Sequence, residues 1–152
     1  LSSPAKVKRQ VVGVFDKKLM KIFAEALKNL NLKKAYIVNS QDGLDEISPY
    51  ANTNIVELDN GKIKEFILNP KEMGIKAGNL SNIIGKDPDY NSMKMKEVFK
   101  GEDNDFSTAI CLNAAAGLVV ADKTNSFKSG YEELKKHILS GKVTNHISNL
   151  TK

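Results

Sequence analysis

The sequence has no tryptophan, and aromatic residues make up only 7% of its 152 residues. Its one cysteine, Cys111, excludes an intrachain disulfide, which fits the reducing cytoplasm. No apolar run approaches the roughly 20 residues that a membrane-spanning helix needs. The first residues also show no apolar segment of the signal-peptide type after their charges. We therefore expect a cytoplasmic protein without a membrane partner.

Several patterns of chemically active residues are missing as well. Histidine and cysteine do not occur at zinc-ligand spacing, and we expect His137 and His146 to be surface residues. Cys111 stands in an apolar run, where a buried core thiol is expected and not the electropositive setting of a catalytic cysteine. Residues 1–152 contain no glycine-rich phosphate loop. We therefore assign no catalytic residue.

The net charge of +5 comes from lysines that are scattered among acidic residues. Proteins that bind single-stranded nucleic acid interleave aromatic residues with a basic groove, and this sequence does not. A lysine-rich solvated surface explains the charge, so we expect no nucleic-acid partner. With 41% hydrophobic and 27% charged residues, the composition is typical of one globular domain.

The first half of the sequence predicts a βαβ unit and a hairpin. Residues 10–15 form a valine-rich run, which we expect as a strand buried on both faces. Asp16 would cap the following helix, and a second strand at 34–38 should run parallel to the first. Asn60-Gly61, between two strand-like runs, predicts a type I′ hairpin over 53–68.

The second half predicts helices. We expect them in the following places: a short helix from Asn69-Pro70 to Gly74, one from Asn91 as N-cap to about Lys100, a buried one at 105–121, an amphipathic one from Ser126 to Gly141, and a weak one at about 142–149. Asn113 in the apolar run must find hydrogen-bond partners, which indicates a structural role. The whole pattern predicts an α/β fold with a mostly parallel sheet, an attached β-hairpin and flanking helices.

The most distinctive stretch is residues 42–48, Asp-Gly-Leu-Asp-Glu-Ile-Ser, which follows the second strand. Asp42-Gly43 is a turn signal. Asp45 and Glu46 then stand at the carboxyl end of a strand, the edge where open α/β sheets bind ligands. Paired carboxylates suit Mg²⁺, which takes one or two carboxylates and completes its shell with water and substrate phosphates. On composition alone, a solvated acidic loop is the favoured alternative.

Residues 42–48 resemble the DGLDE signature of the anthranilate phosphoribosyltransferases and match DGLDEIS at every position. Gly85-Lys86-Asp87-Pro88 resembles the Gly-Gly-Asp-Pro of this family, with lysine in place of a glycine. Asn39-Ser40 departs from the His-Gly that is common there. The resemblance implies that residues 1–152 are the carboxyl-terminal part of an α/β domain like that of nucleoside phosphorylases and phosphoribosyltransferases, without the amino-terminal helical domain.

The resemblance also implies a function. These enzymes transfer the phosphoribosyl group of phosphoribosyl pyrophosphate to anthranilate in tryptophan biosynthesis, as homodimers, and Asp45 and Glu46 would hold Mg²⁺. The family's Gly-Thr-Gly-Gly-Asp loop and its anthranilate-contacting residues have no counterpart in residues 1–152. We therefore expect the chain alone to be inactive and to expose a sheet edge or an apolar face. A related phosphorylase or transferase with another acceptor, and a non-catalytic anion-binding domain, remain alternatives.

Overall fold

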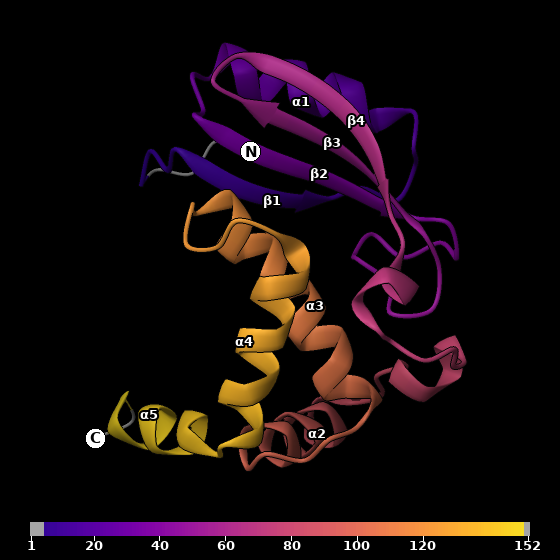
Figure 1. Cartoon of the computed structure of the whole chain (residues 1–152), viewed down its shortest axis with the longest axis vertical. Helices are drawn as coiled ribbons and strands as arrows, with labels where there is room; N and C mark the ends of the chain where they lie inside the picture. Colours follow the sequence, from indigo (N-terminus) through magenta and orange to yellow (C-terminus); the bar gives the residue numbers. More distant parts are fainter. Residues whose placement is uncertain (1–4, 151–152) are drawn as a thin grey trace.

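The computed structural model describes residues 5–150 as a four-stranded sheet with helices (Figure 1). The elements follow in this order: β1 (Arg9–Gly13), α1 (Leu19–Asn29), β2 (Lys34–Ser40), β3 (Thr53–Asp59), β4 (Lys62–Leu68), the short 3₁₀ helices η1 (Pro70–Met73) and η2 (Leu80–Ile83), α2 (Pro88–Phe99), α3 (Asp105–Val120), α4 (Phe127–Leu139) and α5 (Lys142–Leu150). In Figure 1 the sheet and α1 lie at one end of the molecule and α2 and α5 at the other, with α3 and α4 between them. Within residues 5–150 no helix combines the length and the apolar character needed to cross a membrane.

The sheet has the strand order β1-β2-β3-β4. β1 and β2 are parallel, as the βαβ pattern predicts, and β3 and β4 form the predicted hairpin. The α/β class is confirmed, but the sheet is not mostly parallel: among the described strands, one of the three pairings is parallel and two are antiparallel. Parallel neighbours need a long crossover, usually a helix. The connection from β2 to β3 contains no helix, so the chain reverses there.

The hairpin turn follows its sequence signal closely. Asn60 and Gly61 both have positive φ, 46° and 81°, as a type I′ turn requires. β3 and β4 pair in register from Asp59↔Lys62 to Thr53↔Leu68. The predicted hairpin over 53–68 is therefore confirmed.

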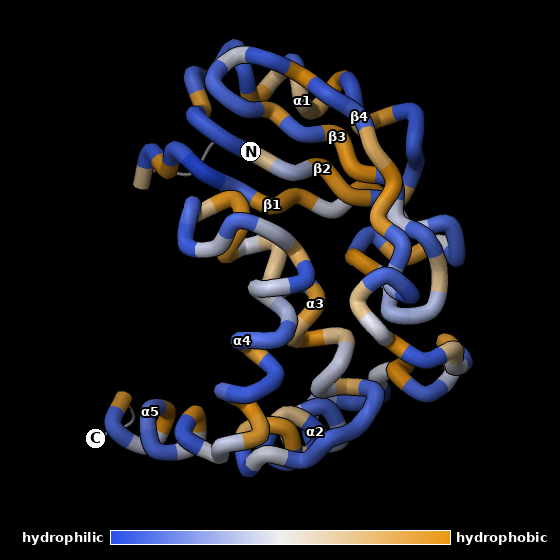
Figure 2. Tube along the Cα trace, viewed as in Figure 1, coloured by the Kyte–Doolittle hydropathy of each residue, from blue (hydrophilic) through white to orange (hydrophobic). Residues whose placement is uncertain are grey.

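Different helices cover the two faces of the sheet. Ile37 of β2 packs with Leu27 of α1 on one face, and Val38 packs with Leu112 of α3 on the other. Figure 2 shows hydrophobic segments along α3 and in the strands above it. β1 is one of the two edge strands of the described sheet, and Val11 is 37% exposed, so the expected burial of this strand on both faces is wrong. Among the described strands, β1 has a neighbour on one side only.

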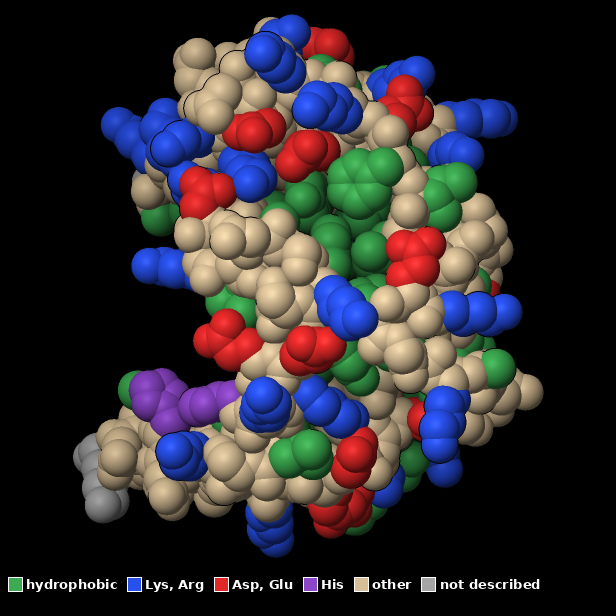
Figure 3. All heavy atoms as spheres, in the orientation of Figure 1, with side chains coloured by type: hydrophobic (Ala, Val, Ile, Leu, Met, Phe, Trp, Pro, Cys, Tyr) green, Lys and Arg blue, Asp and Glu red, His purple; other side chains and the backbone are tan. Residues whose placement is uncertain are grey.

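An aromatic cluster lies where the hairpin meets α4. Tyr36 of β2 stacks on Phe127, with ring centroids 5.6 Å apart, and meets the edge of Phe66 at 5.9 Å. Figure 3 shows hydrophobic side chains open to solvent on this face, between the hairpin and α4. Phe66 is 37% exposed there. The expectation of an uncovered apolar surface is thus met in the described residues.

Two helix starts differ from their predicted positions. Lys18 occupies the N-cap position of α1, and Asp16 instead accepts a hydrogen bond from the Lys18 backbone nitrogen. α2 begins after Asp87, whose side chain accepts from the Tyr90 nitrogen, and Asn91 lies inside the helix. An Asp-Pro step suits this start, because proline at the first helical position has φ already set.

Other local predictions are confirmed. Asn69 and Ser126 cap η1 and α4. Cys111 is 1% exposed, and burial raises the pKa of its thiol. His137 and His146 are exposed.

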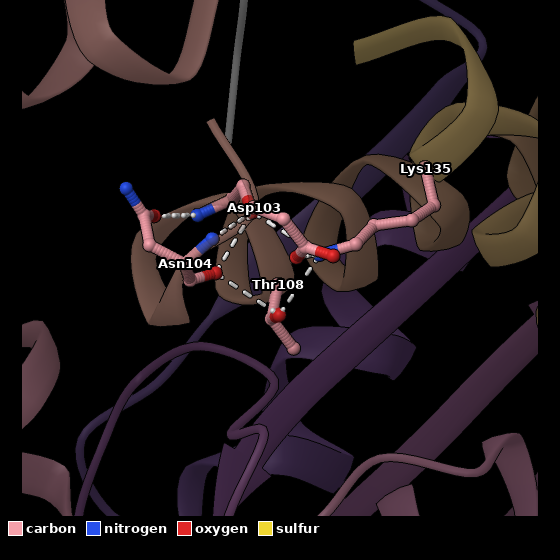
Figure 4. A network of polar contacts seen from close by, with 5 residues as sticks. Asp103, Asn104, Thr108 and Lys135 are labelled. Atoms are coloured by element: carbon pink, nitrogen blue, oxygen red, sulfur yellow. Dashed lines mark hydrogen bonds and ion pairs between the residues drawn. The ribbon is translucent and has the colours of Figure 1, made fainter. Parts of the chain in front are cut away.

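A polar network joins α4 to the start of α3 (Figure 4). Asn104 and Ser107 form a reciprocal capping box. The Lys135 ammonium of α4 donates to the Ser107 and Thr108 hydroxyl oxygens at 3.1 and 3.2 Å and pairs with Asp103. Because the lysine side chain is only 16% exposed, these partners replace most of its water. The start of α3 is therefore fixed by α4.

The other end of α3 is held by charges from the sheet. Asp122, just after the helix, pairs with Arg9 of β1 and with Lys34 of β2, and Arg9 also donates to the Val120 carbonyl. Hydrogen bonds from Arg9 and Lys34 lower the pKa of Asp122 to about 2. The carboxyl end of α3 is thereby tied to the beginning of both parallel strands.

We predict that Asp122→Asn lowers thermal stability at neutral pH and has little effect in acid. The folded pKa of Asp122, about 2, lies below its ordinary value of 3.8. Its carboxylate therefore stabilises the folded state fully at a pH above 3.8. This stabilising contribution decreases as the pH falls from 3.8 to about 2. Asparagine tolerates the left-handed backbone of this position, where φ is 54°, so the exchange tests the charge.

Thermal unfolding followed by circular dichroism from neutral pH down to the folded pKa measures this effect. Glu133→Gln, which removes an exposed carboxylate of α4, is the matched control. An equal loss of stability by Asp122→Asn at both ends of the pH range would contradict the ion-pair explanation.

Candidate functional site

The carboxylate pair lies on the loop between β2 and β3. Asp45 and Glu46 are both exposed and follow the carboxyl end of β2. Within residues 5–150 neither side chain has a hydrogen-bond or ion-pair partner. The predicted position of the pair is confirmed, and both side chains are available to a ligand.

The loop begins with a tight turn. The Gly43 nitrogen donates to the Ser40 carbonyl at 3.1 Å, and the Ser40 nitrogen donates to the Leu44 carbonyl at 2.9 Å. Gly43 has φ of 95°, a conformation that glycine adopts without steric cost. The turn predicted from Asp42-Gly43 is therefore present, directly before Asp45.

Asp42 and Ser48 close the loop. The buried Ser48 hydroxyl donates to the Asp42 carboxylate at 2.6 Å and accepts from the backbone nitrogens of Tyr50 and Ala51. The Ser48 nitrogen donates to the Thr53 hydroxyl oxygen. Asp42 therefore has a structural partner, unlike the two carboxylates between it and Ser48.

Asn113 of helix α3 holds the loop through hydrogen bonds to the loop backbone. Its Oδ1 accepts from the Ile47 nitrogen at 2.9 Å, and its Nδ2 donates to the Ile47 carbonyl at 2.9 Å and to the Ala109 carbonyl at 3.1 Å. The predicted need of Asn113 for hydrogen-bond partners is thus met. The sequence did not indicate that the partner is the residue directly after Glu46.

Gly13, the last residue of β1, packs closely against the backbone of the loop. A Cβ atom at this position would lie 1.6 Å from the Asp45 carbonyl oxygen, so only glycine fits against the loop backbone. The sequence-based prediction treated this strand as core packing and missed the contact. A glycine inside a valine-rich strand is itself a signal of close backbone approach.

An open cavity of about 900 Å³ begins at this loop. Its wall consists of residues from β1, β2, the loop, η2, α2 and α3, among them Asp45, Glu46, Lys94, Phe106 and Asn113. Ile84, 58% exposed, and Met95, 43% exposed, make part of the wall apolar. The carboxylate pair thus lies at the edge of a largely apolar hollow, the type of place where small ligands bind.

The donor set suits a hard cation that shares its shell with a ligand. Within the described residues there is no group of three or more histidine, cysteine, aspartate or glutamate side chains that could hold a metal by themselves. Mg²⁺ needs only one or two protein carboxylates when substrate phosphates complete its shell. The unpaired side chains of Asp45 and Glu46 fit that requirement.

Comparisons with known proteins give consistent results. Residues 1–144 match the family model described as "Glycosyl transferase family, a/b domain". The anthranilate phosphoribosyltransferase of Pelagibacter ubique is 57% identical over 150 residues, which cover 99% of this chain and 46% of that protein. The enzyme of the same name from Desulfatibacillum aliphaticivorans is 38% identical over 152 residues, which cover 100% of this chain and 45% of that protein.

Solved structures agree with the sequence relatives. The crystal structure of anthranilate phosphoribosyltransferase from Thermus thermophilus has a TM-score of 0.86 at 30% identity, covering 96% of this chain and 43% of the other. The Saccharomyces cerevisiae enzyme in complex with PRPP and Mg has a TM-score of 0.80 at 26% identity, covering 90% of this chain and 40% of the other. The chain therefore spans a little under half the length of the relatives that it matches.

We predict that Gly13→Ala displaces the backbone of Asp45 and destabilises the fold by about 1–3 kcal/mol, the usual cost of overpacking. Gly117→Ala is the matched control, because a Cβ there meets nothing within 4 Å and α3 gains a better helix former. Chemical denaturation measures the stabilities, and backbone amide chemical shifts of residues 43–47 report the displacement. Unchanged shifts in Gly13→Ala would contradict the close contact.

Proposed function

The chain belongs to the glycosyl transferase family defined by its a/b domain, and on that basis we propose that it contributes the magnesium-binding loop of an anthranilate phosphoribosyltransferase. In this proposal residues 1–152 are the carboxyl-terminal part of the α/β domain, and an amino-terminal helical domain lies outside them. The reaction is transfer of the phosphoribosyl group from phosphoribosyl pyrophosphate to anthranilate, giving phosphoribosyl-anthranilate and pyrophosphate.

The observation that carries the proposal is the unpaired carboxylate pair at the cavity. Asp45 and Glu46 stand within the DGLDEIS stretch, exposed and without a partner in the described structure. The relatives named anthranilate phosphoribosyltransferase support the assignment of the reaction. The yeast structure with PRPP and Mg, similar in fold, supports the choice of ligand and metal.

The chemistry explains why such a pair is useful. As the bond from the ribose to pyrophosphate breaks, positive charge develops on the sugar and negative charge on the leaving group. Bound Mg²⁺ supplies positive charge that neutralises the leaving pyrophosphate. Asp45 and Glu46 would hold the metal, and the loop around them would set where the pyrophosphate lies relative to the cavity. No proton transfer is assigned to a residue of this chain.

The remaining features of the function follow from the same proposal. Phosphoribosyl pyrophosphate and anthranilate are the small-molecule partners, Mg²⁺ is the cofactor, and the complete enzyme is a cytoplasmic homodimer. Residues 1–152 contain no glycine-rich loop to donate backbone hydrogen bonds to the phosphates. That part of the site is supplied from outside residues 1–152.

A chimera tests the proposal. The chain replaces the matching 150-residue segment of the Pelagibacter ubique relative, which keeps its own remaining sequence. We expect this chimera to consume anthranilate in the presence of phosphoribosyl pyrophosphate and Mg²⁺, followed as loss of anthranilate fluorescence. A folded chimera that turns over another acceptor but not anthranilate would replace the proposal with the related-transferase alternative.

We predict that Asp45→Asn and Glu46→Gln in this chimera raise the Mg²⁺ concentration for half-maximal rate at least about tenfold, the scale on which disturbed metal sites lose affinity. Each exchange removes one anionic oxygen donor and keeps the side-chain shape. Glu132→Gln, which changes an exposed carboxylate of α4, is the control. Wild-type Mg²⁺ dependence in both loop variants would remove the metal role from the proposal.

We further predict that residues 1–152 alone give no turnover at an enzymatic rate. Positioning of reactants accounts for roughly 7–11 kcal/mol of barrier reduction in well-oriented reactions. Without the phosphate-binding loop the ribose is not held in line with an acceptor. The same fluorescence assay on the purified chain measures this, and ordinary turnover would show that the described cavity is sufficient.

A further inference from the structure

We propose that Asn113 is the positioning residue of the carboxylate loop, so that helix α3 sets the direction of Asp45 and Glu46 toward the metal. This inference rests on the proposed function, because it concerns the same metal site. In the described structure Asn113 is hydrogen-bonded to neither carboxylate: its bonds run to the backbone of Ile47, the residue after Glu46, and to the Ala109 carbonyl. Its role is to orient the loop.

The contact is reciprocal and uses the whole carboxamide. Oδ1 of Asn113 accepts from the Ile47 nitrogen and Nδ2 donates to the Ile47 carbonyl, both at 2.9 Å. The second hydrogen of Nδ2 donates to the Ala109 carbonyl at 3.1 Å, one turn earlier in α3. This third bond fixes the rotation of the carboxamide. The backbone nitrogen and the carbonyl of Ile47 are therefore both held in a fixed orientation.

The support behind Asn113 is rigid. Leu112 is fully buried and shares a core cluster with Ile47, which is 1% exposed. The start of α3 is fixed by the network of Lys135, and its end by the ion pairs of Asp122. Since α3 is restrained at both ends, the Asn113 side chain in the middle of the helix can hold the loop in a fixed position at the cavity.

Gly13 restrains the other side of the pair. Its Cα lies against the Asp45 backbone so closely that a Cβ would meet the carbonyl oxygen at 1.6 Å. Asp45 is therefore restrained from β1, and Glu46 lies directly before the residue held from α3. The two carboxylates stand between these restraints, which pre-organises them for a shared ligand and reduces the ordering cost of binding.

The test uses the chimera with phosphoribosyl pyrophosphate present and anthranilate absent, so that substrate phosphates can complete the metal's shell. Mn²⁺ serves as a paramagnetic probe for Mg²⁺. Asn113→Ala is compared with Asn69→Ala, which removes the side-chain cap of η1 and lies outside α3 and the carboxylate loop. Hydrogen exchange of the Ile47 amide reports the clamp, and Mn²⁺ broadening of the amide signals of residues 43–47 reports metal binding. Chemical denaturation gives the stability of each variant.

We expect Asn113→Ala to lose the protection of the Ile47 amide and to need about tenfold more Mn²⁺ for half-maximal broadening, the loss typical of groups that orient metal ligands. Asn69→Ala should lower stability, because it removes a helix cap, while leaving the Mn²⁺ midpoint within about twofold of wild type. If Asn113→Ala does not fold, Asn113→Gln keeps a carboxamide for the buried partners, displaced by one methylene, and should raise the midpoint in the same direction.

The outcomes separate the two proposals. If Asp45→Asn raises the Mn²⁺ midpoint and a folded Asn113 variant does not, the positioning role is wrong and the metal role stands. If wild type shows no selective broadening at residues 43–47, the metal role fails and the positioning role with it. In that case a protected Ile47 amide that is exposed in Asn113→Ala still identifies a purely structural clamp.

Discussion

The packing of α3 against one face of the sheet is the contact on which the rest of the site depends. Leu112 and Ala116 fill the space beside Val38 and Ile55, and this burial fixes the helix relative to the strands. Apolar burial supplies the driving force, at roughly 25 cal/mol per Å² of surface removed from water, but it is not directional. Direction comes from the polar contacts at the start, middle and end of the helix.

The local part of the fold could be predicted from the sequence because its causes are local. The hairpin at Asn60-Gly61, the cap at Ser126 and the buried helix around Leu112 each follow from backbone preference or apolar spacing within a few residues. The share of parallel strands could not be predicted in this way. It depends on whether the β2–β3 connection crosses over or reverses, and neither choice leaves a periodic signal. The N-cap at Asp87 was missed although Pro88 directly follows it, because Asn91 offered a competing cap of equal intrinsic preference.

The candidate site also has a part that local sequence signals predict and a part that depends on the fold. Asp45 and Glu46 could be found from a turn signal, a strand end and a short motif. Their supports could not, because Ile47 and Asn113 are separated by 66 residues in the sequence. A glycine inside β1 signals a close backbone approach but not its partner, because only the fold brings the end of β1 against the loop that follows β2. Residues that offer chemistry carry a local pattern, whereas residues that orient them are defined by the fold.

The same sequence separation has a consequence for the order of folding. β1, α1 and β2 are neighbours in the chain and can pair early, whereas the loop after β2 gains its Asn113 contact only when α3 has docked. Contacts between distant residues carry a greater loop-closure cost and tend to form late. During synthesis the carboxylates therefore emerge from the ribosome well before the helix that orients them. Pulse-labelled hydrogen exchange would show this as protection of the Ile47 amide after the amides that join β1 to β2.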